Sequence, residues 1–396
     1  MLTRQIISQF ASNARAVRDL PDTSLSAWLG RETPNEVRHL LNLCPRHQAT
    51  PLRRLDAMAR ALGVAAIYAK DESNRLGLGS FKALGGAYAV AELVLGWAAE
   101  TLGRPVAPAE IMTTAVKESV KNRTLCCATD GNHGRSVAAG ARLFGCKAVI
   151  FVHQNVEEDR RAMLRALDAQ VVEVLGTYDV SVDVCASEAK ANGWQLVSDT
   201  SWKSHGDSPA RVMQGYTVLI DETLMQIDIP PTHVFVQGGV GGLAGAVAGH
   251  LADVFGEKRP MMIVVEPDRA ACLISSALAG QATEVAAGEL TLMAMLECFR
   301  PSDTAWPVLD RYVDAFMTLS DTSAIDIVQT LAKPLGADPT ISCGLSGGVG
   351  LAGLLAAAQD PQVRAMLGLD HRSRILTIIT EGAAAQSVNK PISILV

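Results

Sequence analysis

Short apolar runs rich in β-branched residues alternate along this chain with longer segments of helical periodicity. Ala- and Leu-rich segments with an apolar residue every three or four positions cover residues 136–144, 158–169 and 242–255. The predicted strands lie at residues 64–70, 124–129, 147–153, 170–175, 194–199, 232–237, 261–266, 315–320 and 374–380. Because parallel strands need crossover connections, the alternation predicts an α/β fold of parallel sheets with flanking helices.

The chain has 396 residues, more than one typical domain holds, so at least two lobes are expected. Residues 1–20 are basic and contain no acid before Asp19. We expect them to form an amphipathic surface helix. Their composition also weakly resembles a mitochondrial presequence, and they lack the apolar core of a secretory signal.

Composition and charge argue against several classes of function. The net charge is −6, and lysine and arginine form no long block, so nucleic acid is not an expected partner. No window offers the roughly 18 consecutive apolar residues of a membrane span. The eight cysteines form no CxxC pair or zinc-like cluster, so we expect no metal and no disulfide. Thiols in apolar runs indicate a reduced, cytoplasmic protein.

Two loops carry candidate cofactor chemistry. A glycine loop follows the strand at 232–237 and precedes a helix, an arrangement that binds phosphate through converging N–H groups. It matches neither a P-loop nor a dinucleotide fingerprint, so a single phosphate fits better; glycines that serve only close packing are the alternative. Lys82 lies in the small, apolar stretch "GSFKALGGAYAV", although lysine is rarely buried without a partner. A lysine that can form an imine and one phosphate site together indicate pyridoxal phosphate.

Two polar residues can supply the remaining cofactor contacts. Asn132 lies in the tight turn "ATDGNHGRS" after a predicted strand, where its amide can reach the phenolic oxygen of the cofactor. Thr380 ends the strand "LTIIT" with a neutral hydroxyl that can bond the ring nitrogen. The candidate cofactor-binding residues are therefore Lys82, Asn132, Gly238, Gly239, Val240, Gly241, Gly242 and Thr380.

Together these motifs resemble a known family. The runs "KDESNRLGLGSFKALGGAYA", "TDGNHGR", "DTSW", "QGGVGGLAGA", "VEPDRA" and "TEG" resemble the fold-type II pyridoxal-phosphate enzymes, which include threonine dehydratase and the β subunit of tryptophan synthase. Within that group they look like diaminopropionate ammonia-lyase, from about Leu52 to Gly382. The resemblance implies a homodimer whose subunit has two open, twisted parallel-sheet lobes. Residues 1–87 and 205–396 would form the large cofactor-binding domain, and residues 88–204 the small one.

The same resemblance implies the reaction and its catalytic residues. The expected activity is α,β-elimination of D- or L-2,3-diaminopropionate through an aminoacrylate to pyruvate and ammonia. Lys82 would form the Schiff base, and Asp130 and Asp199 would transfer protons for opposite stereoisomers. From the residues alone, Asp130 can instead cap a turn, and Asp199 can be a helix N-cap. Thr129, Asp130 and His133 are the candidate substrate-binding residues, with His133 packed in the turn and given no proton role.

The chain departs from the family pattern at several positions. Leu345 stands where the family tends to have glutamate, Met295 and Phe299 stand where it usually has glycines, and Arg300 adds a charge. These changes leave the cofactor assignment intact, but they weaken the assignment of diaminopropionate as the substrate. The alternatives are N-substituted diaminopropionate, hydroxyaspartate, or serine and threonine, and a catalytically silent sensor of small molecules is a further one.

Overall fold

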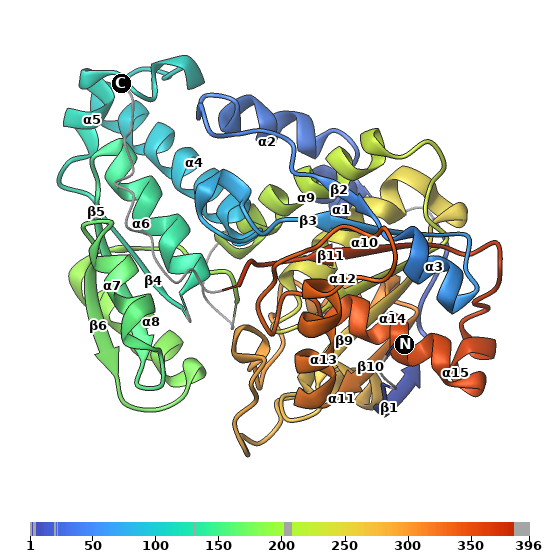
Figure 1. Ribbon diagram of the computed structural model, residues 1–396. Helices are drawn as coiled ribbons and strands as arrows, with labels where there is room; N and C mark the ends of the chain where they lie inside the picture. Colours follow the sequence, from blue (N-terminus) through green and yellow to red (C-terminus); the bar gives the residue numbers. More distant parts are fainter. Residues whose placement is uncertain are drawn as a thin grey trace.

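Two separate β-sheets organise the molecule (Figure 1). The computed structural model describes residues 2, 5–19, 21, 23–129, 131–201 and 208–383. The larger sheet has seven strands in the order β1-β10-β9-β8-β11-β3-β2, and the smaller has four in the order β6-β5-β4-β7. In chain order, β1–β3 belong to the large sheet, β4–β7 form the whole small sheet, and β8–β11 complete the large sheet.

The large sheet is parallel in its interior and antiparallel at both edges. Its inner strands are fully or almost fully buried and are rich in Val, Ile and Phe, as expected for a sheet covered on both faces. Its strands are β1 (Ile7–Ser12), β2 (Leu52–Arg54), β3 (Ala66–Asp71), β8 (His233–Gln237), β9 (Met261–Pro267), β10 (Ala315–Leu319) and β11 (Arg374–Ile379).

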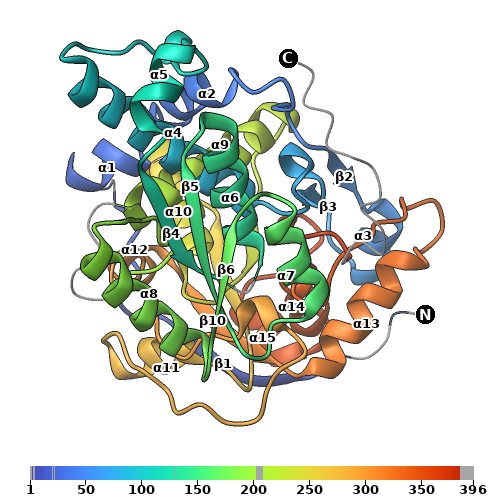
Figure 2. The same ribbon diagram turned by 90° about the vertical axis from the view of Figure 1, so that its left-hand side faces the viewer.

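The small sheet is parallel throughout and consists of β4 (Thr124–Ala128), β5 (Lys147–His153), β6 (Gln170–Val174) and β7 (Gln195–Leu196). Figure 2 shows its strands with α6 and α7 on one side and α8 on the other. Successive residues of β4 pack into different apolar clusters, since Leu125 and Cys127 belong to one and Cys126 and Ala128 to another. This alternation is what a strand covered on both faces requires.

Helices surround both sheets and join them. The α-helices are α1 (Thr23–Leu29), α2 (Thr33–Leu41), α3 (Asp56–Leu62), α4 (Lys82–Leu102), α5 (Thr114–Val120), α6 (Asn132–Phe144), α7 (Glu158–Arg165), α8 (Tyr178–Asn192), α9 (Ser208–Gln226), α10 (Gly242–Phe255), α11 (Cys272–Ala279), α12 (Trp306–Tyr312), α13 (Asp321–Ala332), α14 (Val349–Gln359) and α15 (Pro361–Met366). Short 3-10 turns are η1 (Arg75–Gly77), η2 (Pro108–Glu110), η3 (Gly256–Lys258) and η4 (Ala294–Leu296). The largest apolar cluster contains Ile150 of the small sheet and Val264 of the large sheet, so one core runs across both.

The predicted α/β fold with parallel sheets is confirmed, and each of the nine predicted strands overlaps a strand of the structure. The strand predicted at 194–199 is short, because only Gln195–Leu196 pair with β4. The expectation of a surface helix at the N-terminus is wrong for Ile7–Ser12, which form β1 antiparallel to β10. Pairing with the free edge of β10 gives the backbone N–H and C=O groups of both strands hydrogen-bond partners, and this gain outweighs the weak helical periodicity of the N-terminal segment.

The predicted domain division remains a prediction. Its first boundary, between residues 87 and 88, falls within α4, which runs unbroken from Lys82 to Leu102. In the described part of the chain no helix is long and apolar enough to cross a membrane. The same residues contain no cluster of three His, Cys, Asp or Glu side chains that could hold a metal ion.

Candidate active site

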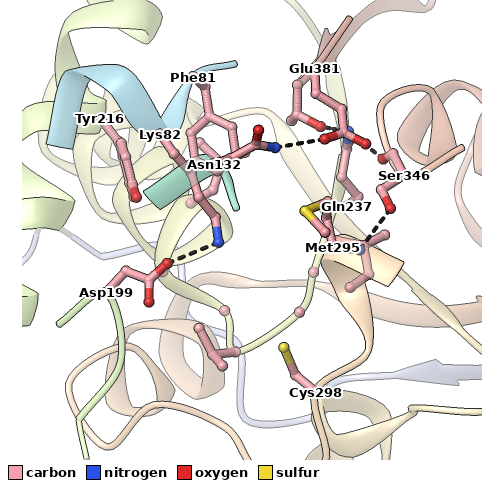
Figure 3. Close-up of a pocket in the computed structure, with 18 of the residues that line it drawn as sticks. Phe81, Lys82, Asn132, Asp199, Tyr216, Gln237, Met295, Cys298, Ser346 and Glu381 are labelled. Carbon is pink, nitrogen blue, oxygen red and sulfur yellow. Dashed lines mark hydrogen bonds and ion pairs between the residues drawn. The ribbon is translucent and has the colours of Figure 1, made fainter. Parts of the chain in front are cut away.

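A pocket of about 670 Å³, including its open mouth, lies where loops from the two sheets meet (Figure 3). The large sheet contributes the start of α4 and the loops after β8 and β11, and the small sheet contributes the start of α6 and the chain after β7. Functional groups of parallel sheets gather at the carboxyl ends of the strands, as seen here. The lining residues are Phe81, Lys82, Asn132, Tyr178, Asp199, Tyr216, Gln237, Gly238, Gly239, Val240, Gly241, Gly242, Leu243, Met295, Leu296, Cys298, Ser346, Thr380 and Glu381.

Lys82 and Asp199 face each other across this pocket. Lys82 is the first residue of α4, and its Nζ lies 2.9 Å from Asp199 Oδ2. Tyr178 donates its hydroxyl to Asp199 Oδ1 at 3.2 Å. Burial by itself would raise the pKa of Asp199, but the positive charge of Lys82 and its hydrogen bond, with the one from Tyr178, lower that pKa to about 2. Asp199 is therefore an ionised carboxylate beside the lysine amine.

A fully buried lysine, Lys70 on β3, provides a comparison. All three of its N–H donors have acceptors, since Nζ lies 2.9 Å from Glu222 Oε2, 2.9 Å from Thr50 O and 3.0 Å from Gln226 Oε1. Lys70 is fully shielded from solvent, whereas the Lys82 side chain is 17% exposed and lines the pocket. Of these two lysines, Lys82 is thus the one that a ligand can reach.

The glycine loop joins β8 to α10 and forms one wall of the pocket. Gly241 has φ +97°, a conformation that favours glycine, and a Cβ on Gly238 would lie 2.6 Å from Leu273 Cδ1. The backbone N–H groups of residues 239–242 have no acceptor among the described residues. Together with the positive end of α10 they form a site for a phosphate group.

Asn132 begins α6 directly after Gly131, whose φ of +137° forms the tight turn. Thr129 Oγ1 accepts the N–H groups of Gly131 at 2.9 Å and Gly134 at 3.0 Å and so stabilises this turn. Asn132 Nδ2 donates to Glu381 Oε2 at 2.7 Å (Figure 3). An amide NH₂ has two protons, so Asn132 keeps a second donor for a ligand.

Thr380 follows β11 and supplies a neutral hydroxyl to the pocket. Its Oγ1 accepts a hydrogen bond from Gln237 Nε2 at 2.7 Å, and its backbone N–H donates to Gly347 O at 3.0 Å. Its carbonyl oxygen also accepts the N–H of Phe81 at 3.0 Å, so the hydroxyl proton is the group of Thr380 that remains available for a ligand.

The predicted site residues fall into three groups. The predicted residues Lys82, Asn132, Asp199, Gly238, Gly239, Val240, Gly241, Gly242 and Thr380 all line the one pocket. Thr129 and His133 do not line it. His133 is fully buried, its Nε2 lies 2.7 Å from Val197 O, and burial lowers its pKa. Asp130 lies outside the described residues.

Several lining residues were not predicted from the sequence, among them Tyr178, Tyr216, Gln237, Ser346 and Glu381. Glu381 and Gln237 directly flank predicted residues, so their positions at or just after the end of a strand could have indicated them. Tyr178 is the first residue of α8 and Tyr216 lies within α9, and a buried aromatic residue in a helix normally indicates core packing.

The structure also locates the departures from the family pattern. Leu345 packs against an apolar cluster and does not line the pocket, while the carboxylate beside Asn132 comes from Glu381. Met295 lines the pocket, and its sulfur lies 3.1 Å from Arg160 Nη1. Phe299 is buried elsewhere, and neither it nor Arg300 is a lining residue.

Comparison with known proteins agrees with this geometry. Residues 43–381 match the family described as "Pyridoxal-phosphate dependent enzyme". The chain is 37% identical over 342 residues to the diaminopropionate ammonia-lyase of Escherichia coli strain K12, with 85% of each chain covered. It is 34% identical over 371 residues to the enzyme of the same name from Salmonella typhimurium, covering 90% of this chain and 91% of the relative.

Solved structures show the same relationship. The Escherichia coli diaminopropionate ammonia-lyase in complex with an aminoacrylate–PLP azomethine reaction intermediate superposes with a TM-score of 0.85 at 32% identity, over 96% of this chain and 95% of that one. Threonine deaminase isoform 2 from Solanum lycopersicum, at 18% identity and a TM-score of 0.70, shares the fold. The chain therefore belongs to the pyridoxal-phosphate dependent enzymes, with the fold-type II architecture.

Proposed function

We propose that this protein catalyses the α,β-elimination of 2,3-diaminopropionate, giving 2-aminoacrylate that hydrolyses to pyruvate, with release of two molecules of ammonia. The observation that carries the proposal is that Lys82, an adjacent carboxylate and a glycine loop share one pocket in a chain 37% identical to a diaminopropionate ammonia-lyase. The enzyme is thus a carbon–nitrogen lyase.

The pocket residues fit pyridoxal phosphate. When bound, the cofactor withdraws electrons from the substrate α-carbon and makes its proton acidic. Lys82 would hold the cofactor aldehyde, the free N–H groups of residues 239–242 would bind its phosphate, and Asn132 would donate to its phenolic oxygen. Thr380 would bond the ring nitrogen through its hydroxyl.

Asp199 is our candidate for proton transfer on one face of the bound substrate. Its carboxylate is ionised and lies beside Lys82, so it can accept the α-proton directly or through the lysine amine. We assign Asp130 the same task on the opposite face, as the two-stereoisomer reaction requires. The β-amine leaves as ammonia only when protonated, and the ammonium form present at neutral pH meets this need.

The direct test measures pyruvate and ammonia released from D- and L-2,3-diaminopropionate, with D- and L-serine alongside. We expect turnover of at least one diaminopropionate isomer well above that of serine. Asp130→Asn and Asp199→Asn should each reduce turnover mainly of one isomer, by about 10²- to 10⁴-fold, the usual range for loss of an acid–base group. If each variant lost the same amount of activity on both isomers, the assignment of one aspartate to each face of the bound substrate would be wrong.

A hydroxyl-eliminating activity is the second candidate. The chain is 25% identical over 286 residues to a probable D-serine dehydratase of Colwellia psychrerythraea, and the Escherichia coli ammonia-lyase has been crystallised in complex with D-serine. N-substituted diaminopropionates and hydroxyaspartate belong in the same substrate panel, because Met295, one of the departures from the family pattern, lines the pocket. Faster pyruvate release from D-serine than from diaminopropionate would favour this second function.

We further propose a cytoplasmic homodimer whose large domain comprises residues 1–87 and 205–396 and whose small domain comprises residues 88–204. The eight free cysteines are compatible with a reducing compartment. The separate four-stranded sheet between Thr124 and Leu196 supports the small domain. Sedimentation velocity would test the assembly, and a monomer at micromolar concentration would contradict it.

A further inference from the structure

Gln237, the last residue of β8, is almost fully buried at the wall of the pocket. Its Nε2 lies 2.7 Å from Thr380 Oγ1 and 2.8 Å from Gly347 O. The carbonyl oxygens of Ile378 and Ser346 lie 3.2 Å and 3.3 Å from the same nitrogen. One side-chain amide therefore connects the ends of two strands and the loop before α14.

The surroundings fix the orientation of this amide. Carbonyl oxygens only accept hydrogen bonds, so the end of the Gln237 amide that faces three of them must be the NH₂ group. If the amide were turned over, its oxygen would face three other oxygens and be repelled by each. Gln237 is therefore the donor to Thr380, and Thr380 Oγ1 is the acceptor.

This direction limits where the Thr380 hydroxyl can point its proton. A hydroxyl has a single proton, and the Thr380 proton must point away from the NH₂ group of Gln237. None of the described residues accepts a hydrogen bond from Thr380 Oγ1. Because Thr380 lines the pocket, it presents its O–H as a donor to whatever is bound there.

We propose that Gln237 is a positioning residue, which makes Thr380 a one-way hydrogen-bond donor to the ring nitrogen of pyridoxal phosphate and so keeps that nitrogen unprotonated. The proposal rests on the contact of Thr380 with the ring nitrogen given under the proposed function. A protonated ring nitrogen is itself a donor. To accept from it, Thr380 would have to turn its own proton away from the ring, either toward the Gln237 NH₂ group, where two donors would oppose each other, or toward its third bonding direction, where none of the described residues accepts it.

The chemical consequence concerns the choice between reactions. A protonated ring stabilises a carbanion at the α-carbon strongly and lets it persist long enough to be reprotonated elsewhere. An unprotonated ring stabilises it less, so loss of the β-leaving group is favoured over transamination. Gln237 would act through Thr380, without donating to the ring nitrogen itself, and would thereby favour elimination over transamination.

The test uses the holoenzyme reconstituted with cofactor labelled with ¹⁵N in the ring, and follows the ¹⁵N NMR signal against pH. The informative variant is Gln237→Met, which keeps the side-chain length and removes the NH₂ group. The Thr380 hydroxyl can then turn toward the vacated carbonyl oxygens and accept from a protonated ring. We expect the midpoint of ring protonation to rise by about one pH unit, the size expected for one hydrogen bond.

Three further variants show whether Gln237 acts through Thr380. Thr380→Val should raise the same midpoint, and adding Gln237→Met to it should cause no further change. Thr380→Ser keeps the hydroxyl and should behave as the unmodified protein. Thr377→Val changes a buried threonine of the same strand that does not line the pocket, and it should leave the ring signal unchanged.

A ring nitrogen that is protonated at neutral pH in the unmodified holoenzyme would overturn the proposal. The proposal would also be overturned if the midpoint of ring protonation were unchanged in Gln237→Met but shifted in Thr380→Val. If Gln237→Met does not bind the cofactor, the comparison of the unmodified protein with Thr380→Val decides, and equal midpoints overturn the proposal. The measurement needs no turnover, so a failure of diaminopropionate elimination would be recognised separately.

Discussion

Tyr178 adds a third residue to the pair formed by Lys82 and Asp199. Its hydroxyl donates to the Asp199 oxygen that does not face Lys82, so it holds the carboxylate in one orientation. Although burial opposes this, the positive charge of Lys82 and the hydrogen bonds from Lys82 and Tyr178 lower the pKa of Asp199 to about 2, so the carboxylate beside the lysine amine is ionised. Tyr178 therefore orients the carboxylate and, together with Lys82, helps to keep it ionised.

Tyr178→Phe should reduce kcat/KM by about 10- to 100-fold, since a hydrogen bond to a charged group contributes about 1.5–3 kcal/mol. The loss should fall mainly on the stereoisomer that Asp199→Asn also impairs. Steady-state kinetics with both isomers of diaminopropionate provide the measurement. Losses that are equal for the two isomers, or confined to the one that Asp199→Asn spares, would contradict the assignment.

Residue-scale prediction from the sequence depended on local pattern. Lys82 and Thr380 were found because each is a polar residue in an unusual apolar context next to a strand or helix end. Tyr178 was missed because its function comes from a contact with a residue 21 positions away. Glu381 was missed because Asn132, its partner, is 249 positions away, and no local spacing records such a pair.

At the scale of elements, the position of Lys82 depends on how closely α4 approaches α9. A Cβ on Gly215 of α9 would lie 2.6 Å from Gly85 Cα and 2.9 Å from Leu84 O, both on α4. These are backbone atoms that cannot move aside without shifting the helix. The helix that begins with Lys82 is thus packed against α9 without room for a methyl group.

Gly215→Ala should lower the free energy of unfolding by about 1–3 kcal/mol, the usual cost of overpacking, and weaken cofactor binding. Gly96→Ala is the matched control, because Gly96 is exposed on α4 and a Cβ there would meet nothing within 4 Å. That control should be neutral or stabilising by up to about 1 kcal/mol. Urea unfolding of the two variants provides the comparison, and similar stabilities would refute the close-packing account.

Glu266 supports the glycine loop from behind. It is fully buried at the end of β9 and accepts the N–H groups of Leu273 at 2.8 Å and Ile274 at 2.7 Å, at the start of α11. Burial raises its pKa from an ordinary 4.5 to about 8, although the two N–H groups act in the opposite direction. Since Gly238 packs against Leu273, this carboxyl helps to set the loop position.

The raised pKa predicts a pH-dependent stability. Between 4.5 and about 8 the folded protein retains a proton on Glu266 that the unfolded chain has lost, so stability falls as pH rises through this window. Glu266→Gln, which cannot titrate, should flatten that part of the profile. Unfolding free energies measured at several pH values in the window check this, and parallel profiles for the two proteins would exclude the Glu266 contribution.

At the scale of the whole molecule, a buried ionic cluster connects the segment before Lys82 to α9. Glu222 of α9 lies 2.9 Å from Lys70 Nζ and 2.6 Å from Arg75 Nη2, and both cations are fully shielded from solvent. Arg75 also pairs with Glu72 at 2.7 Å. Removing one member of such a cluster leaves a charge buried without its partner.

Glu222→Gln should destabilise the protein by about 3–5 kcal/mol, because Lys70 and Arg75 lose the carboxylate that they share. Glu118→Gln is the matched control, since its pair with Lys121 is more than half exposed. That exposed pair should contribute about 1 kcal/mol or less. Thermal unfolding of both variants is the measurement, and comparable shifts in Tm would contradict the account of the buried cluster.

The architecture was largely predictable from the sequence because buried parallel strands carry strong apolar patterns, as in β5 and β8. The edge strands β1 and β2 were not, since half-exposed antiparallel strands have weak patterns and depend on a partner strand. The pocket between the sheets could be anticipated only through the loops that line it. The pairing of Lys82 with Asp199 depends on tertiary packing and emerged from the structure.

The most direct test of the account is to locate the cofactor on the polypeptide. The purified holoenzyme is reduced with borohydride, digested and analysed by mass spectrometry, with Lys82→Ala as the control. We predict one phosphopyridoxyl group on Lys82 and none in the variant. A modification on Lys70 or another lysine, or a holoenzyme without any reducible adduct, would contradict the central claim.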